Sequence, residues 1–165
     1  MEDTGAPVEG ASQNNAIKIN KYIKPCLVSD LLTDLIMTRN ETRKIKEDEN
    51  LQNYIAEELI NGCIRPNFVS FKYLRDAILV YVKDKNGEIA LKSKAYKIVS
   101  EMNNSNIIAV ERGIRTIISR DWDKTTHDFR IKYFGAFGVL GNRKPTPKEF
   151  VMSIADQIKR DLKDR

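Results

Sequence analysis

Three charged side chains fall close together in the stretch VERGIRTIISR, residues 110–120. A helix of about 3.6 residues per turn would bring Glu111, Arg112 and Arg115 to one side. An arginine can donate two parallel hydrogen bonds to guanine, and a glutamate can accept one from cytosine. A plainer interpretation is an exposed ion pair between Glu111 and Arg115, at positions i and i+4, worth about 0.3–0.5 kcal/mol. The spacing alone leaves both interpretations open.

The surrounding residues predict the helix that carries these side chains. Apolar residues recur at helical spacing, at Ile107, Val110, Ile114, Ile117 and Ile118. They predict a helix over 107–120 with one buried face, and the charged residues and Ser119 lie mostly away from it. Gly113 costs about 1 kcal/mol in a helix interior relative to alanine. We therefore expect it to allow close approach to a partner helix or to DNA.

A short helix and a polar turn precede this predicted helix. The stretch KSKAYKIVSEMN predicts a helix with Ala95, Ile98, Val99 and Met102 facing inward. Four polar residues, NNSN (103–106), separate it from the helix over 107–120. A short helix, a tight turn and a longer helix are the arrangement of a helix-turn-helix, whose second helix lies in the major groove of DNA.

The rest of the chain also shows helical periodicity. A leucine-rich amphipathic helix is expected over 27–39, and the charged run 40–50 is either its solvated extension or a hinge. Further helices are expected over 51–59, capped by Gly62, and over 71–82, closed at Asn86-Gly87. One more short helix and a glycine-bearing loop should follow Trp122.

The clearest helix signal lies near the C-terminus. Thr146 is a predicted N-cap, Pro147 is suited to the first helical position, and Glu149 completes a capping box. Apolar residues then repeat at i, i+4 spacing, at Phe150, Ile154, Ile158 and Leu162. No strand pattern is evident, so we expect an all-α protein that includes an N-terminal amphipathic helix.

Side chains that commonly perform catalysis or bind metals are scarce. The chain has two cysteines, Cys26 and Cys63, without a CxxC pair, and one histidine, His127. A zinc site cannot be assembled from them. We expect no enzyme activity, no catalytic residue, no metal site and no cofactor.

The composition of the 165 residues, 41% hydrophobic and 31% charged, is globular. No apolar run reaches the roughly 18 residues of a membrane span, and the acidic N-terminus is unlike a secretion signal. We therefore expect a soluble, cytoplasmic protein without membrane contact.

Charge is distributed unevenly along the chain. Residues 1–60 hold 7 Lys/Arg and 11 Asp/Glu, a net charge of −4, whereas residues 61–165 hold 21 and 12, a net charge of +9. A basic surface attracts polyanions, above all nucleic acid. The charge indicates a nucleic acid as a partner of the C-terminal two-thirds, and the predicted helix-turn-helix makes double-stranded DNA the expected one.

Three sequence blocks together resemble one family. VERGIRTII followed by Trp122 is similar to the signature VERAIRHAI…W, and FKYLRDAI (71–78) is similar to an aromatic-x-Tyr-Leu-Arg-Glu-Ala-Ile block. KPTPKEFVMSIADQIK (144–159) resembles a Lys-Pro-Thr-x-x-Glu-Phe…Ala-Asp block. These signatures belong, in this order, to the DNA-binding effector domain of the sporulation master response regulator, the stage zero sporulation protein A family. The resemblance covers about residues 50 to 162.

The resemblance implies an all-α effector domain of about six helices that contains a helix-turn-helix, preceded in this chain by the N-terminal amphipathic helix. Such a transcription regulator binds a short promoter box and often occupies DNA as a tandem dimer. Glu111 and Arg112 would contact bases, and Arg115 a base or a phosphate. Contacts to the DNA backbone are expected from the turn, the end of the reading helix and the basic stretch before the last helix, at Asn103, Ser105, Ser119, Arg143 and Lys144. A homodimer on DNA and RNA polymerase are the expected protein partners.

This chain departs from the family pattern at several positions. Ile108-Ala109 stand where the family usually has Ser-Arg, which removes a positive contact, and Gly113 and Thr116 replace Ala and His. Residues 1–48 show no alternating strand pattern of a phosphorylated receiver domain, so we expect no switching by an aspartyl phosphate in this chain.

The sequence therefore predicts three regions. Residues 1–16 would be disordered or a linker, 17–48 an N-terminal helical segment, and 49–165 the helix-turn-helix effector domain. The helix over 27–39 would either pack on the effector core or serve as an oligomerisation or docking element. An alternative function stays open, in which the chain is a receiverless interaction module that sequesters another regulator or RNA polymerase through its acidic N-terminal segment.

Overall fold

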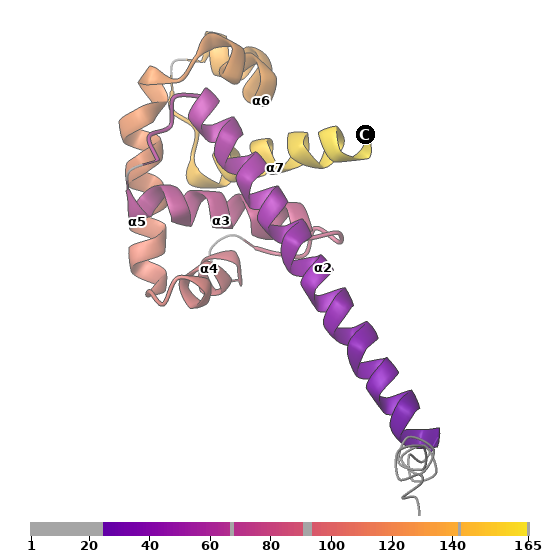
Figure 1. Cartoon of the computed structure of the whole chain (residues 1–165). Helices are drawn as coiled ribbons and strands as arrows, with labels where there is room; N and C mark the ends of the chain where they lie inside the picture. Colours follow the sequence, from indigo (N-terminus) through magenta and orange to yellow (C-terminus); the bar gives the residue numbers. More distant parts are fainter. Residues whose placement is uncertain (1–24, 67, 91–93, 142, 165) are drawn as a thin grey trace, which may run out of the picture. The chain divides into compact units, whose positions relative to one another are not determined.

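The computed structural model of the chain describes residues 25–66, 68–90, 94–141 and 143–164, with side chains from Val28 onward (Figure 1). It divides into two compact units, Met1–Lys46 and Glu47–Arg165, which we describe separately. The expected disordered or linker segment 1–16 lies outside the described residues, as does the beginning of the expected helical segment 17–48.

The described residues are helical and contain no strand, which confirms the all-α prediction. The elements are α2 (Pro25–Asn61), α3 (Val69–Lys83), α4 (Tyr96–Met102), α5 (Ile107–Asp121), the 3-10 turn η2 (Trp122–Lys124), α6 (His127–Leu140) and α7 (Pro147–Lys163). In the second unit, α3 packs against both α5 and α7, and α5 crosses the ends of these two helices (Figure 1).

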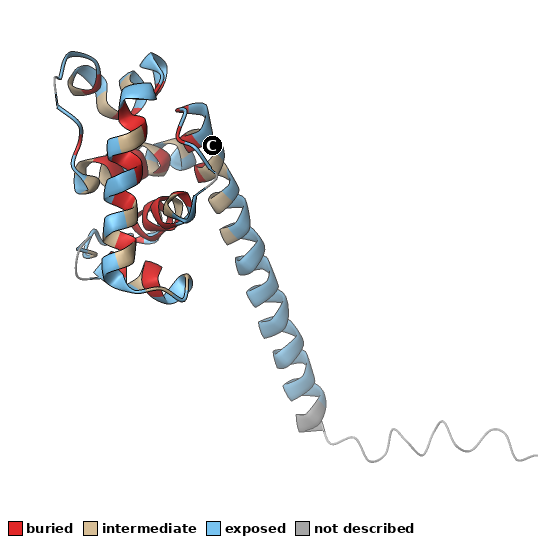
Figure 2. Ribbon diagram, turned by 90° about the vertical axis from the view of Figure 1, so that its left-hand side faces the viewer, coloured by how far each residue is buried: buried red, intermediate tan, exposed pale blue. Residues whose placement is uncertain are grey.

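Helix α2 corrects the expected boundaries near the N-terminus. Separate helices were expected over 27–39 and 51–59, but α2 is continuous through both. The charged run 40–50 is therefore a helix extension, and its interpretation as a hinge is wrong. No proline or glycine interrupts the helix between residues 26 and 61. Among the described residues of the first unit, the leucine-rich face is exposed (Figure 2), at Val28, Leu31, Leu32, Leu35 and Ile36.

The core of the second unit confirms most of the predicted apolar stripes. Its fully buried side chains come from the end of α2 and from α3, α4, α5 and α7, and include Ile55, Leu59, Leu74, Ile78, Val99, Val110, Ile114, Ile117, Phe150, Ile154 and Ile158. Ile107, Met102 and Leu162 were expected to face inward, but each is exposed. They lie in the first or last turn of their helices, which extend past the packed interior.

The end of α2 is held by a Schellman motif. The N–H of Ile64 donates to the carbonyl of Leu59 at 3.0 Å, and the N–H of Cys63 donates to Ile60 at 2.8 Å. Cys63 has a φ of 65°, so it occupies the left-handed position that glycine usually fills. Gly62, the expected cap, instead allows the Phe129 ring to pack closely against the helix, because a Cβ on this residue would lie 2.4 Å from that ring.

Cys63→Gly should therefore stabilise the protein by about 1 kcal/mol, since the left-handed backbone costs a side chain about that much. The midpoint of urea unfolding would measure this. As an opposite control, Gly62→Ala should destabilise the protein by about 1–3 kcal/mol, because its methyl group would overlap Phe129. A lower urea midpoint for Cys63→Gly would contradict the assignment of the cap.

The last two helices contain the glycine and cap features seen in the sequence. Gly135 interrupts α6 with a φ of 54°, which is left-handed backbone inside the expected short helix. At α7, Thr146 Oγ1 accepts from the N–H of Glu149, and the Glu149 carboxylate accepts from the N–H of Thr146 at 2.7 Å. Pro147 occupies the first turn, so the capping box is confirmed.

Candidate nucleic-acid interface

Helix α4, a polar turn and α5 form the helix-turn-helix. The turn reverses through Asn104, which has a φ of 48°. Asn106 then caps α5, because its Oδ1 accepts a hydrogen bond from the N–H of Ala109 at 2.8 Å. The Tyr73 hydroxyl of α3 lies 2.8 Å from Ser105 Oγ and fixes the turn to the core. These contacts set where α5 begins.

Asn103 anchors the other end of the turn. Its amide nitrogen donates to Asp76 Oδ2 at 2.8 Å and to the Val99 carbonyl at 2.9 Å. Asp76 is buried and also accepts from Arg75 at 2.7 Å. The Asn103 and Ser105 side chains were expected to face the DNA backbone, but in the free protein both are engaged with α3 or α4. Their DNA contacts stay predictions.

The outward side of α5 forms a line of four residues opposite the core. Ile108, Arg112, Arg115 and Ser119 follow one another at i, i+4, i+7 and i+11, so they share one face of the helix. All four are exposed. We call these residues the outward line. The buried face of α5 consists of Val110, Ile114, Ile117, Ile118 and Asp121.

The predicted base-contacting residues differ in how they are held. Arg115 Nη2 lies 2.8 Å from Glu111 Oε1, so the ion pair considered from the sequence forms. The Arg115 side chain is nevertheless 63% exposed, against 32% for Glu111. Arg112 is exposed and takes part in none of the hydrogen bonds or ion pairs found among the described residues. Its five N–H donors are therefore available to an outside acceptor.

Gly113 determines how closely α5 approaches α3. A Cβ on this glycine would lie 2.9 Å from the Tyr73 ring, at Cδ2, and 3.4 Å from Ser70 Oγ. The sequence left open whether this glycine serves a partner helix or DNA. The structure assigns it to the packing of α5 on α3.

The predicted phosphate contacts after α5 are also partnered in the free protein. Lys144 Nζ donates to the Ser119 carbonyl at 2.8 Å and pairs with Asp123 at 2.7 Å, so Ser119 and Lys144 lie together. Arg143 binds both carboxylate oxygens of Glu149, at 2.7 and 3.0 Å. Hydrogen bonds from Arg143 hold the pKa of Glu149 at about 2. Both cations remain exposed to solvent.

A buried ion-pair cluster braces the C-terminal end of α5, and sequence analysis missed it. Asp121 is fully buried and accepts from Arg120 at 2.6 and 2.8 Å. It also accepts from Arg65, through the backbone N–H at 3.2 Å and the guanidinium at 2.9 and 3.1 Å. The Arg120 guanidinium lies 4.2 Å from the centre of the Phe68 ring. A buried acid between the adjacent Arg120 and an arginine 56 residues earlier leaves no periodic signal.

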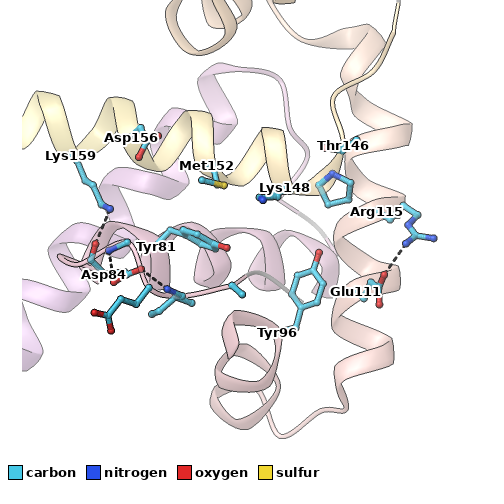
Figure 3. A pocket seen from close by; sticks show the side chains of 15 residues that line it. Tyr81, Asp84, Tyr96, Glu111, Arg115, Thr146, Lys148, Met152, Asp156 and Lys159 are labelled. Carbon is cyan, nitrogen blue, oxygen red and sulfur yellow. Dashed lines mark hydrogen bonds and ion pairs between the residues drawn. The ribbon is translucent and has the colours of Figure 1, made fainter. Parts of the chain in front are cut away.

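A cavity of about 710 Å³ lies beside α5, bounded by the end of α3, the loop after it and α7. Figure 3 shows the Glu111–Arg115 pair at one end and the hydrogen bond from Lys159 to the Asp84 carbonyl at the other. Burial raises the pKa of Tyr96, which lines the cavity, to about 12, so this phenol stays neutral. Asp84 in the lining has a structural role, because it accepts from the N–H groups of Gly87 and Ile89 and thereby folds the loop.

None of the described helices is long and apolar enough to cross a membrane. Within the described ranges, no group of three histidine, cysteine, aspartate or glutamate side chains is placed to hold a metal ion.

Residues 55–158 match a family model described as sporulation initiation factor Spo0A C terminal. The matched range begins in the last turns of α2, contains the whole helix-turn-helix and ends inside α7.

Proposed function

Because the chain belongs to the family of Spo0A C-terminal domains, which are DNA-binding effector domains of transcription regulators of sporulation initiation, we propose that it reads a short promoter box with α5. In this proposal α5 lies in the major groove. Arg112 and Glu111 contact base edges, and Arg115 contacts a base or a phosphate.

The observation that carries the proposal is the exposure of the outward line. Its two arginines project from the second helix of a helix-turn-helix, and Arg112 has no partner among the described residues. The net charge of +9 on residues 61–165 favours approach to a polyanion. Ser119, the last member of this line, and Lys144, which donates to the Ser119 carbonyl, would contact the adjacent phosphates, and Arg143 would add another contact. A tandem dimer on the box and contact with RNA polymerase are part of the proposal.

A second candidate function rests on a different observation. The leucine-rich face of α2 is exposed within the first unit, and the first 60 residues carry a net charge of −4. Ala109 also stands where the family usually has an arginine. These features favour a module that sequesters another regulator or RNA polymerase. Apolar docking of this kind responds little to salt, whereas binding through several phosphates weakens steeply as salt rises.

Fluorescence anisotropy separates the two functions. A labelled duplex carrying a box selected by the protein from random duplexes is compared with a scrambled duplex, at about 50 and 200 mM salt. We expect a clear preference for the selected box and a loss of affinity of about 10³-fold or more at the higher salt if six or more phosphates are contacted. Failure to select any box, or equal affinity for both duplexes, would contradict promoter-box reading and favour the interaction module.

A further inference from the structure

We propose that Ile108 contacts the 5-methyl group of a thymine and thereby selects a T·A base pair at one position of the box. This inference rests on the proposed function, because it requires α5 to lie in the major groove. It concerns a residue at which the chain departs from the family pattern.

The structure gives Ile108 no role in the protein interior. Its side chain is 78% exposed, although the core face of the same helix is formed by isoleucine and valine side chains that are almost completely buried. A single exposed isoleucine is common on protein surfaces and requires no explanation by itself. The position of this one carries the argument.

Ile108 is the second residue of α5 and the first member of the outward line. Residues at the N-terminal end of a recognition helix are those that reach base edges. Arg112 follows one turn later on the same face, so the two side chains would meet the same groove. The capping contact between Asn106 and Ala109 holds this first turn in helical form.

The chemistry of the groove identifies the target. Among the four base-pair orientations, the apolar group displayed in the major groove is the thymine methyl. An aliphatic side chain gains by covering that methyl and has no hydrogen bond to offer the other base edges. An apolar protein surface fits this face less well, because it would take Arg112 and Arg115 out of water without acceptors.

Replacing thymine with deoxyuridine removes only the methyl group and leaves all hydrogen-bonding groups in place. The protein is first used to select a box from random duplexes. Each thymine of that box is then changed singly to deoxyuridine, and binding is measured by anisotropy at one salt concentration. The full chain is compared with Ile108→Ala and with Leu140→Ala. Leu140 is a matched control, since it is 79% exposed and ends α6.

We expect one deoxyuridine to weaken binding of the unchanged protein by about fourfold, the effect of one buried methyl group. Ile108→Ala should bind the thymine box less tightly and should respond no further to that deoxyuridine. Leu140→Ala should keep the fourfold discrimination.

Two results would overturn the inference while leaving promoter-box reading intact. One is a protein that prefers its selected box over the scrambled duplex but tolerates every deoxyuridine. The other is an Ile108→Ala variant that keeps the fourfold discrimination. If no box can be selected, the proposed function fails first and the inference fails with it.

Discussion

Arg112→Ala is expected to weaken binding to the selected box by about 1–3 kcal/mol, roughly 5- to 150-fold, and to relax base choice at one position. The effect should be large because Arg112 is exposed and forms no hydrogen bond or ion pair among the described residues. Binding would not first have to break a contact within the described structure. Dissociation constants for the box and for its single-base variants, measured by anisotropy, provide the test.

Arg160→Ala is the matched control for Arg112→Ala, because it also removes one exposed guanidinium, from α7. It should change affinity little and leave base choice unaltered. A uniform loss on every duplex after Arg112→Ala, with the salt dependence reduced by one phosphate contact, would assign Arg112 to the DNA backbone. That outcome would contradict its role as a base reader.

Asp121→Ala is expected to lower the free energy of unfolding by about 3 kcal/mol. Removing one partner of a buried ion pair costs about 3–5 kcal/mol, and we take the lower end because Arg65 and Arg120 are 45% and 26% exposed and can be rehydrated. The change also leaves the backbone N–H of Arg65 without its acceptor. Urea unfolding followed by circular dichroism would measure it. An unchanged midpoint would mean that the cluster does not brace α5.

The same carboxylate should make stability depend on pH in the acid range. Burial alone would raise the pKa of Asp121, but hydrogen bonds from Arg120 and Arg65 outweigh it and hold the pKa at about 2, below the ordinary 3.8. A carboxylate whose pKa is lower in the folded than in the unfolded protein stabilises the fold at pH values above its unfolded-state pKa. That stabilisation is lost as the pH falls through the folded-state pKa. We expect about 2 kcal/mol to disappear between about pH 4 and pH 2.

Asp121→Asn is the control for the pH dependence, because it has no proton to gain. Its stability should change less between pH 4 and pH 2 than that of the unchanged protein. Glu149 also has a pKa of about 2, but its side chain is 41% exposed and its contribution is screened by solvent. Equal acid sensitivity in Asp121→Asn would assign the effect to other carboxylates.

Local patterns predicted the helices that have a strong apolar period or a cap. The stripe beginning at Val110 and the capping box of Thr146 and Glu149 depend only on neighbours within a turn or two, so the sequence contains all the information. The continuity of α2 was missed because a solvated charged run and a hinge have similar compositions. The left-handed conformation of Cys63 could not be predicted either. The ring of Phe129 leaves no room for a Cβ on Gly62, so a contact distant in sequence requires glycine there and the left-handed position falls on the next residue.

The sequence predicted which helix carries the candidate site, but it predicted less well which contacts the individual side chains make. Spacing placed Arg112 and Arg115 on the exposed side of α5, where the structure also has them. The same reasoning could not reveal that Asn103 and Ser105 turn toward Asp76 and Tyr73, because those partners come from another helix. The brace at Asp121 was invisible for the same reason, as its partner Arg65 lies 56 residues earlier.

The close contact at Gly113 limits how this domain can be engineered. Retargeting a helix-turn-helix protein often begins by transplanting a whole recognition helix from a relative. A graft from a related domain with alanine at this position would bring a methyl group to 2.9 Å from the Tyr73 ring. Tyr73 also holds the turn through its hydrogen bond with Ser105. The graft would therefore change the orientation of α5 as well as the residues that contact bases. New DNA specificities should therefore be introduced by substituting residues of the outward line alone, with Gly113 kept as glycine.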